Sequence, residues 1–170
     1  MTVIAYRSGI MACDSCWASY GTQTVSALKI KRLSSGALLG SAGENDSREM
    51  EVLLDRIRDP RKLPSRAALA ATKLEYEGLI AFPKGGVYMI STGRMNEAGY
   101  ADLDSADDDS PDLGVWPATT MGGFAACGCG SDYALAAMHA HKSVTAHQAV
   151  RIACHLNVHC RLPVHAMRLR

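Results

Sequence analysis

The amino-terminal segment has the pattern of a tight β-hairpin, and this pattern constrains the fold more than any other feature of the chain. Residues 2–7 and 10–14 are apolar or β-prone, and Ser8-Gly9 between them has the composition of a turn. In an antiparallel hairpin, the numbers of two facing residues have a constant sum, and their midpoint falls in the turn. Thr2 and Asp14 are centred on residue 8, so we expect them to be cross-strand neighbours or to miss this by one residue. The hairpin thus brings a carboxylate close to the start of the chain.

Thr2 becomes the first residue once Met1 is removed, and its small side chain favours that removal. An amino-terminal threonine combines a hydroxyl nucleophile and a free amine in one residue. The unperturbed α-amine has a pKa of about 7.7–8.0, so it can act as a base near neutral pH. A threonine activated by its own amine is a known form of covalent catalysis. Many chains begin with Met-Thr, so this pair gains meaning only from the residues that follow.

Length and charge exclude several classes of protein. The 170 residues are typical of one domain, which we expect to span residues 1–170. Lys and Arg number 18 against 17 Asp and Glu, so bulk charge predicts neither nucleic-acid nor membrane binding. The sequence shows no secretory signal and no apolar run of about 18 residues. Six cysteines in such a chain are best interpreted as free thiols in a reducing cytoplasm.

The first half of the chain predicts two further strands and two helices. Residues 28–33 alternate apolar and basic side chains, which indicates a strand with one wet face, and residues 37–41 form another short strand. Asp46 caps the first helix, with Glu49 three residues on as in a capping box. The apolar stripe of this helix consists of Met50, Leu53, Leu54 and Ile57. Asp59-Pro60 ends it, and a second helix covers residues 67–73.

The second half repeats the order of strands followed by two helices. We expect a hairpin of residues 78–83 and 87–91, a polar loop at 92–121, and a strand at 122–128. Helices follow at 131–141 and from Ser143 or Thr145 to about residue 156. One side of the former holds Tyr133, Ala134, Ala137 and Met138. Residues 157–168 return as a strand that Pro163 interrupts. This order favours an α/β protein of the four-layer αββα sandwich type, with two antiparallel sheets packed face to face between helix layers.

Four ordered segments carry a resemblance to a known family. They read MACDS at residues 11–15, LKIKRL at 28–33, GSAG at 40–43 and GCGSDYA at 128–134. In this order they resemble the N-terminal nucleophile hydrolases of the proteasome family, which are threonine peptidases, and most of all the HslV-like bacterial proteasome homologues. The last segment is similar to the family's Gly-Ser-Gly-x-x-Tyr-Ala stretch. The resemblance covers nearly the whole chain and implies the same four-layer sandwich.

The resemblance also implies a role for each matching residue. Thr2 would be the nucleophile, and its freed amine would take the hydroxyl proton through a water. Lys29 would favour the alkoxide and keep the amine neutral by like-charge repulsion, and Asp14 would pair with Lys29 and orient it. The backbone N–H of Gly43 would donate to the oxyanion of the tetrahedral intermediate. Lys29 and Lys31 share a face of the expected strand, so it is the resemblance that selects Lys29.

The chain departs from the family pattern at three places. Cys129 stands beside the nucleophile where a serine is expected, and a thiol is a weaker donor than a hydroxyl. The aspartate expected after the last helix is not evident, and Asn157 or His155 stands there instead, as a candidate to hydrogen-bond near Thr2. Glu44-Asn45 replace the small residues usual after the oxyanion glycine. The cysteine puts proton relay through residue 129 in question. Glu44-Asn45 leave the substrate preference of the pocket unpredictable.

Other interpretations of these residues are open at this point. Asp14 and Lys29 could form a structural ion pair, and Cys13-x-x-Cys16 has the spacing of a redox or zinc site, although residues three apart on a strand point to opposite faces. The best metal candidate is the group Cys127, Cys129, Cys154, His155, His159 and Cys160. Its spacing is irregular for zinc, and an acidic run at 102–112 lacks the glycine and glutamate of a calcium loop. We therefore expect no metal and no cofactor.

The resemblance implies a threonine endopeptidase that hydrolyses unfolded polypeptides through an acyl-enzyme on Thr2. It also implies self-association into stacked rings with Thr2 facing an inner chamber, because a broad-specificity protease is safe only if folded proteins cannot reach it. The family often works with an ATP-driven AAA+ unfoldase, which the sequence itself does not reveal. Two alternatives share the fold: a small-molecule amidase or acylase with the same nucleophile, and a non-catalytic structural subunit.

Overall fold

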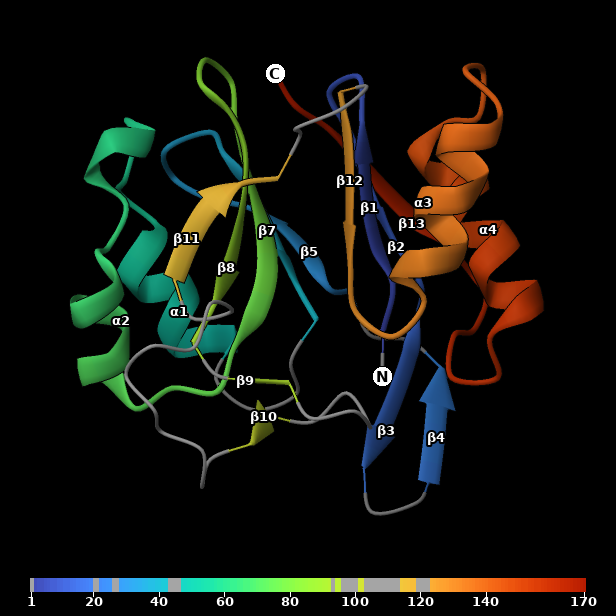
Figure 1. The fold of residues 1–170 in the computed structure, drawn as a ribbon, viewed down its shortest axis with the longest axis horizontal. Coiled ribbons are helices and arrows are strands. Elements are labelled where there is room, and N and C mark those ends of the chain that lie inside the picture. Colours follow the sequence, from blue (N-terminus) through green and yellow to red (C-terminus); the bar gives the residue numbers. More distant parts are fainter. Residues whose placement is uncertain are drawn as a thin grey trace.

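The computed structural model describes residues 2–19, 22–25, 28–42, 47–92, 94–95, 101–102, 114–118 and 123–170. Two large antiparallel sheets pack face to face, and a pair of helices covers the outer face of each sheet (Figure 1). The four-layer αββα sandwich expected from the order of elements is therefore confirmed. Within the described residues, no helix is long and apolar enough to cross a membrane.

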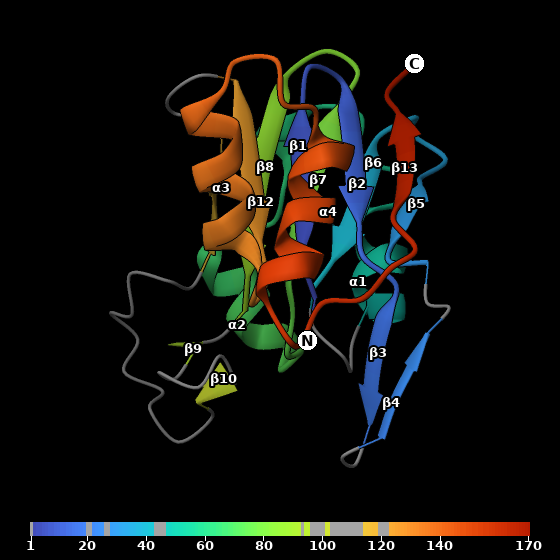
Figure 2. The same ribbon diagram turned by 90° about the vertical axis from the view of Figure 1, so that its right-hand side faces the viewer.

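The first sheet holds the amino-terminal hairpin at its centre. It consists of β1 (Ile4–Arg7), β2 (Ile10–Cys13), β12 (Phe124–Cys127) and β13 (His165–Arg168), in the order β12-β1-β2-β13. Figure 2 shows that α3 (Ser131–Ala140) and α4 (Ala146–Leu156) cover its outer face. The hairpin that begins the chain is thus held between two strands and a helix layer contributed by its carboxyl-terminal third.

The second sheet is built from the middle of the chain. Its order is β11-β8-β7-β6-β5, which comprises Gly114–Pro117, Gly86–Ser91, Glu77–Phe82, Leu38–Ser41 and Ile30–Arg32. Its outer face carries α1 (Ser47–Leu54) and α2 (Arg66–Thr72), joined by the short 3-10 helix Pro60–Lys62 (Figure 1). Two small pairs complete the list: β3 (Cys16–Ser19) with β4 (Thr22–Val25), and β9 (Arg94–Met95) with β10 (Ala101–Asp102).

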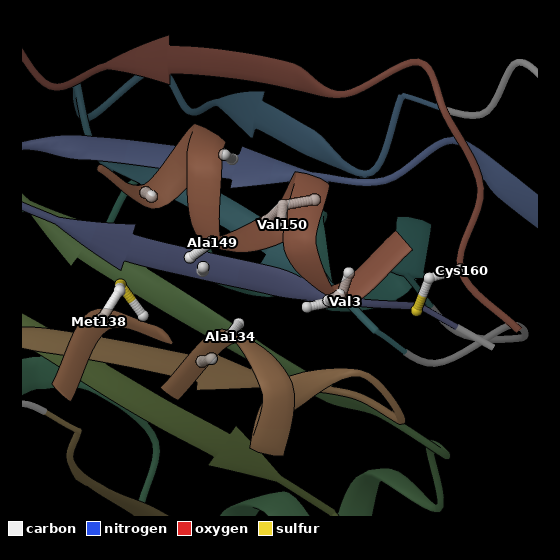
Figure 3. Close-up of a cluster of buried hydrophobic side chains, with 11 residues drawn as sticks. Val3, Ala134, Met138, Ala149, Val150 and Cys160 are labelled. Carbon is white, nitrogen blue, oxygen red and sulfur yellow. The ribbon is translucent and has the colours of Figure 1, made fainter. Parts of the chain in front are cut away.

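Three clusters of buried side chains fill the spaces between the four layers. The cluster between the sheets includes Ile4, Met11, Leu38 and Leu79. Gly40 lets the sheets come close there, because a Cβ at that position would lie 2.8 Å from a side-chain carbon of Ile4. Figure 3 shows the cluster under α3 and α4, and a third cluster lies under α1 and α2. The two helix layers are each anchored by their own core.

The midpoint of the hairpin lies between Ser8 and Gly9, half a residue beyond the expected midpoint at residue 8. Ser8 and Gly9 both have positive φ, at 51° and 78°, which is the geometry of a two-residue primed turn. Ile4 therefore faces Cys13, and the same register carried outward sets Thr2 opposite Ser15 rather than Asp14. Asp14 is one residue from the opposed position, which is the margin that the sequence analysis allowed.

Several expected elements differ from the observed ones. The strand expected at 157–168 exists only at 165–168, and that at 28–33 only at 30–32. Strand β11 lies inside the stretch expected as a loop, residues 92–121. Most of the other residues of this stretch lie outside the described residues. Leu53, which the sequence places in the apolar stripe of α1, is 41% exposed, and Tyr133 of α3 is 40% exposed. Each helix buries a narrower stripe than expected, namely Met50 and Leu54 in α1 and Ala134 and Met138 in α3.

Candidate active site

Thr2 lies just before β1, where its backbone is held by the turn that leads into α3. Its carbonyl accepts a hydrogen bond from the Gly130 N–H at 3.2 Å, and its N–H donates to the Cys129 Sγ at 3.2 Å. The residue is only 3% exposed. Gly128 allows this close approach, because it has a φ of +86° and a Cβ there would lie 2.4 Å from the Thr2 carbonyl oxygen. The turn therefore fixes Thr2 from one side.

Lys29 approaches Thr2 from the other sheet. It lies just before β5, and its carbonyl accepts from the Ser41 N–H at 2.9 Å. Its ammonium donates to the Thr2 Oγ1 and, at 2.9 Å, to the Asp14 Oδ1. The Lys29 side chain is 5% exposed and that of Asp14 is fully buried. One ammonium thus links a hydroxyl and a carboxylate at the junction of the two sheets.

Asp14 follows β2, and the chain around it satisfies its carboxylate. Oδ1 accepts from the Val3 N–H at 3.0 Å as well as from Lys29. Oδ2 accepts from the N–H groups of Cys16 at 2.9 Å and Arg161 at 3.2 Å. A buried carboxylate is tolerated only when its charge is compensated in this way. Because three backbone donors fix its position, Asp14 holds the Lys29 ammonium in one orientation against Thr2.

The two lysines of the LKIKRL segment differ sharply. We expected Lys29 and Lys31 to share a face of a strand, but the strand begins only at Ile30, so the alternation does not include Lys29. Lys31 is 61% exposed and pairs with Glu51 of α1 on the outside of the second sheet. Lys29 instead lies between the sheets, where it contacts Thr2 and Asp14. Because Lys29 precedes the strand, the periodicity of the strand could not distinguish it from Lys31.

Cys129 lies next to Thr2, immediately before the residue that caps α3. Besides accepting from the Thr2 N–H, its Sγ lies 3.3 Å from the Thr2 carbonyl oxygen, to which a protonated thiol can donate. A hydrogen bond from the Cys160 thiol is the largest cause that lowers the pKa of Cys129 from 9.0 to about 6, and the Thr2 N–H adds to it. Burial opposes this shift, although the Cys129 residue as a whole is exposed. The lowered pKa favours the thiolate form of Cys129, in which its Sγ accepts from the Thr2 N–H.

Glu77 belongs to the site, and the sequence analysis missed it. Its Oε1 accepts from the Gly128 N–H at 3.1 Å, and its carbonyl accepts from the Ala42 N–H at 2.7 Å. Burial raises the pKa of Glu77, and the Gly128 N–H partly opposes that shift. The residue ties the turn behind Thr2 to the second sheet. No local pattern marks Glu77, because Gly128 is 51 positions away in the chain.

Asn157 and His155 were the alternatives for the missing aspartate. The Asn157 amide donates to the Cys129 carbonyl at 2.7 Å, and its own Oδ1 accepts from the His159 N–H at 2.8 Å. His155 is exposed on α4. Asn157 therefore reaches the site through the main chain of Cys129, whereas His155 points to solvent. The local sequence alone could not separate the two residues.

Gly43, with Glu44 and Asn45, lies outside the described residues. The described chain leading to it ends at Ala42, whose Cβ would be 3.5 Å from a Cβ placed on Gly128. Residue 42 therefore lies beside the turn that holds Thr2.

The competing cysteine and metal interpretations receive little support from the described residues. Cys13 and Cys16 are buried free thiols, and burial raises the pKa of both, that of Cys13 to about 11. Burial is also the main reason that the pKa of Cys154 rises to about 12. Among the residues with a described position, no three His, Cys, Asp or Glu side chains gather as a metal-binding group. The arrangement that stands out is the one around Thr2.

Comparisons with known proteins agree on the fold. No family model matches the chain, and no curated protein matches it. Among solved structures, that of Thiobacillus denitrificans BPH, a bacterial proteasome homologue, in complex with epoxomicin has a TM-score of 0.62 and 20% identity, covering 99% of this chain and 98% of that chain. A second structure of the same protein gives 0.62 and 19%, covering 99% and 98%. Eukaryotic HslV from Trypanosoma brucei gives 0.52 and 17%, covering 98% of each chain. The chain thus has the fold of proteasome-type N-terminal nucleophile hydrolases.

Proposed function

We propose that this chain, which has the proteasome-type fold, is a threonine-type endopeptidase with Thr2 as its nucleophile. The observation that carries the proposal is the Lys29 ammonium, which donates to both the Thr2 Oγ1 and the buried Asp14 carboxylate. An ordinary ion pair satisfies a carboxylate, but it does not need a hydroxyl at the start of the chain. A cation held against a hydroxyl lowers the cost of forming an alkoxide there.

The reaction begins with removal of Met1, which leaves Thr2 with a free amine. The amine takes the proton of Oγ1 through a water, and the oxygen attacks the carbonyl carbon of a peptide bond. The developing negative charge on Oγ1 is stabilised by Lys29, which Asp14 holds in place. Collapse of the tetrahedral intermediate leaves an ester on Thr2 and releases the amine product. Water then attacks the ester and restores the hydroxyl.

In this proposal the Gly43 N–H donates to the oxyanion of the tetrahedral intermediate. The chain before it is held by hydrogen bonds from the Ser41 N–H to Lys29 and from the Ala42 N–H to Glu77. Both acceptors belong to residues that contact the site, so the chain is held as far as Ala42. A donor of this type contributes about 10²–10³ to turnover.

Cys129 takes the place of the family's serine beside the nucleophile. As a thiolate, it accepts a hydrogen bond from the Thr2 nitrogen and orients the amine toward Oγ1. It does not donate in this state, so the proton moves between Oγ1 and the amine through water rather than through residue 129. Cys129 is therefore assigned to positioning the amine.

The chain self-associates into stacked rings that enclose the Thr2 residues and admit unfolded polypeptides, which an AAA+ unfoldase supplies. Exposed apolar side chains on the helix layers support self-association, among them Val52 on α1, 73% exposed, and Leu156 on α4, 58% exposed. Val52 lies on one outer helix layer and Leu156 on the other, so each layer carries exposed apolar surface that a ring contact would bury. The charge balance of the chain does not favour nucleic acid or membrane as a partner.

Intact-mass measurement after treatment with a peptide epoxyketone tests the proposal, and epoxomicin is a suitable probe of that class. We expect the mass of the chain without Met1 plus one probe molecule. Thr2→Ala is the matched control, because alanine also favours Met1 removal but lacks the hydroxyl; it should give no adduct. Persistent labelling of Thr2→Ala would move the nucleophile to a cysteine, and a chain that retains Met1 and takes up no probe would contradict the proposal.

A further inference from the structure

Cys129 contacts Thr2 and Cys160 packs beside Gly130, the next residue, and the proposed reaction uses only Cys129. Cys129 precedes α3, and Cys160 lies in the segment that follows α4. A Cβ on Gly130 would lie 2.7 Å from the Cys160 Sγ and 2.8 Å from the Val3 Cβ, so Cys160 packs at the base of the nucleophile's strand. Figure 3 shows Cys160 at the Val3 end of this cluster. The pair joins segments about thirty residues apart in sequence.

The two cysteines differ in exposure and in protonation. Cys129 is exposed, whereas Cys160 is 1% exposed. The Cys160 thiol donates to Cys129 and holds the pKa of Cys129 at about 6. The same contact, with burial, raises the pKa of Cys160 far above its usual range. Cys129 also lies next to the positive amino-terminal end of the ten-residue helix α3, which favours a thiolate. One sulfur is a reachable nucleophile, and its neighbour is a shielded thiol.

Asn157 holds the two segments together. Its amide donates to the Cys129 carbonyl at 2.7 Å, and its carbonyl accepts from the Cys160 N–H at 3.1 Å. The backbones on either side of the thiol pair are therefore tied through one residue. Both cysteines lie in connecting segments rather than inside a helix or strand, and an S–S bond between them would be about 2.05 Å long.

We infer that Cys129 and Cys160 are a hydroperoxide-sensitive modification site, in which Cys129 is oxidised first and Cys160 closes a disulfide onto it. The Cys129 thiolate attacks the terminal oxygen of a hydroperoxide. An S–O bond forms, the O–O bond breaks, and the alkoxide takes a proton and leaves as an alcohol or as water. The Cys160 thiol then attacks the sulfenic sulfur, and its proton leaves with the hydroxyl as water. Two thiols are oxidised and one hydroperoxide is reduced.

The other four cysteines do not share this environment. Cys13, Cys16 and Cys127 are buried, and burial raises the pKa of each. Cys154 is half-buried, and its pKa rises to about 12. A thiol that stays protonated reacts slowly with peroxides, because the thiolate is the nucleophile. Oxidation is thus directed to Cys129.

The disulfide also changes the candidate active site, a consequence that rests on the proposed function. The Cys129 thiolate accepts from the Thr2 nitrogen, and a disulfide sulfur carries no negative charge to accept with. A hydrogen bond to a charged partner contributes enough that its loss slows reaction of Thr2 about tenfold or more. Reduction of the disulfide restores the thiolate. Thr2 would then react more slowly after peroxide and recover its rate with a dithiol.

Peroxide titration of the full chain tests the modification without any assay of peptidase activity. After graded hydrogen peroxide, the protein is alkylated under denaturing conditions and weighed intact. We expect loss of two alkylatable thiols of the six, a dimedone adduct at Cys129 at early times, and full recovery with dithiothreitol. Trypsin releases Cys129 together with Cys127 and Cys160 together with Cys154, so fragmentation of the linked peptide must assign the bond.

Two variants form a matched pair. Cys160→Ser should stop at the sulfenic acid of Cys129 and form no disulfide, whereas Cys154→Ser, from the same tryptic peptide, should form the disulfide as the wild type does. A bond through Cys127 or Cys154, an unmodified Cys129, or the same disulfide yield in Cys160→Ser would overturn the inference. The dimedone assay on the wild type decides the first step even if Cys160→Ser does not fold.

Epoxyketone labelling of oxidised and reduced protein then tests the consequence for Thr2. We expect labelling about tenfold slower after oxidation and restored by dithiothreitol. If the disulfide forms but the reduced protein does not label at all, the proposed function fails and the modification site stands. Equal labelling of both forms removes the link between the thiol pair and Thr2.

Discussion

Lys29 connects the two sheets at the candidate site. Its ammonium contacts the hydroxyl that precedes β1 and the carboxylate that follows β2, although the residue itself comes from the second sheet. Three backbone N–H groups hold the Asp14 carboxylate, and that carboxylate in turn orients the Lys29 ammonium. The chemistry of the site therefore depends on how accurately the two sheets are docked.

Lys29→Ala should lower the rate of Thr2 labelling by at least 10²-fold, because it removes the positive charge that stabilises the alkoxide. Lys31→Ala is the matched control. Lys31 is 61% exposed and pairs with Glu51 on the outer face, so its loss should leave labelling within twofold and stability within about 0.5 kcal/mol. Intact mass against time measures the rates, and wild-type labelling by Lys29→Ala would refute its role.

Gly128 holds the turn that positions Thr2. Gly128→Ala should destabilise the protein by more than the strain of its positive φ alone, because the new Cβ would lie 2.4 Å from the Thr2 carbonyl oxygen. Gly123→Ala is the control: it has a φ of +71° but open space, so it should cost only about 1–2 kcal/mol. Urea unfolding measures both. Equal costs for the two variants would mean that the turn moves away from Thr2 without penalty.

Glu77 gives the site a pH dependence whose sign follows from its environment. Burial raises the pKa of Glu77 in the folded state above its ordinary value of 4.5. The folded protein therefore binds this proton more tightly than the unfolded chain does. The stability that this proton provides is complete below the ordinary pKa and is lost as pH rises through the raised one.

Glu77→Gln should therefore gain stability relative to the wild type as pH rises from about 4 to 7. The amide keeps an oxygen that can accept from the Gly128 N–H, so the hydrogen bond itself can persist. Urea midpoints measured at several pH values give the difference between the two proteins. A difference that stays constant over this range would show that Glu77 does not titrate with a raised pKa.

At the scale of elements, the amino-terminal hairpin and the helices are the parts that local sequence specifies. Ser8-Gly9 accepts the positive φ values of a two-residue turn, and that turn sets the register of everything outward to Thr2. Helix α4 begins at a full capping box formed by Thr145 and Gln148. The sheet below a helix decides which of its apolar residues are buried, and Leu53 of the expected stripe therefore stays partly exposed.

Leu54 and Leu53 of α1 offer an internal comparison of that point. Leu54 is fully buried under the second sheet, so Leu54→Ala should lower the free energy of unfolding by about 2–5 kcal/mol. Leu53 is 41% exposed, and Leu53→Ala should cost less than about 1 kcal/mol. Chemical denaturation compares the two. Equal costs would mean that α1 is rotated relative to the described orientation.

At the scale of the whole molecule, the layers place the amino terminus where both sheets and the α3 turn meet. Thr2 is held by the first sheet and by the turn before α3, and it is contacted by Lys29, which lies just before β5 of the second sheet. The same layers leave apolar side chains on the outer helices exposed. The proposed ring assembly would bury such side chains.

The assembly state separates the proposed protease from the alternative amidase. The mature chain of 18.2 kDa should elute in sizing chromatography as a species of hundreds of kDa, because stacked rings require many copies. Thr2→Ala should elute at the same position, since the nucleophile is not needed for packing. A labelled species only a few times the chain mass would favour the small-molecule amidase or acylase. A large species that retains Met1 would favour a structural subunit.

The sequence by itself determined the order of the two helix pairs and of the main strands around them, the hairpin to within one residue, and the group of residues worth testing around Thr2. These features depend on turn composition, capping and periodicity over a few residues, which the chain carries locally. Strand periodicity could not separate Lys29 from Lys31, and it was the family resemblance that selected Lys29. Tertiary structure alone decided that Asn157 and not His155 reaches Cys129, and that Glu77 and Cys160 join the site. Those contacts link residues far apart in the chain, and only the docking of one sheet and its helices against the other brings them together.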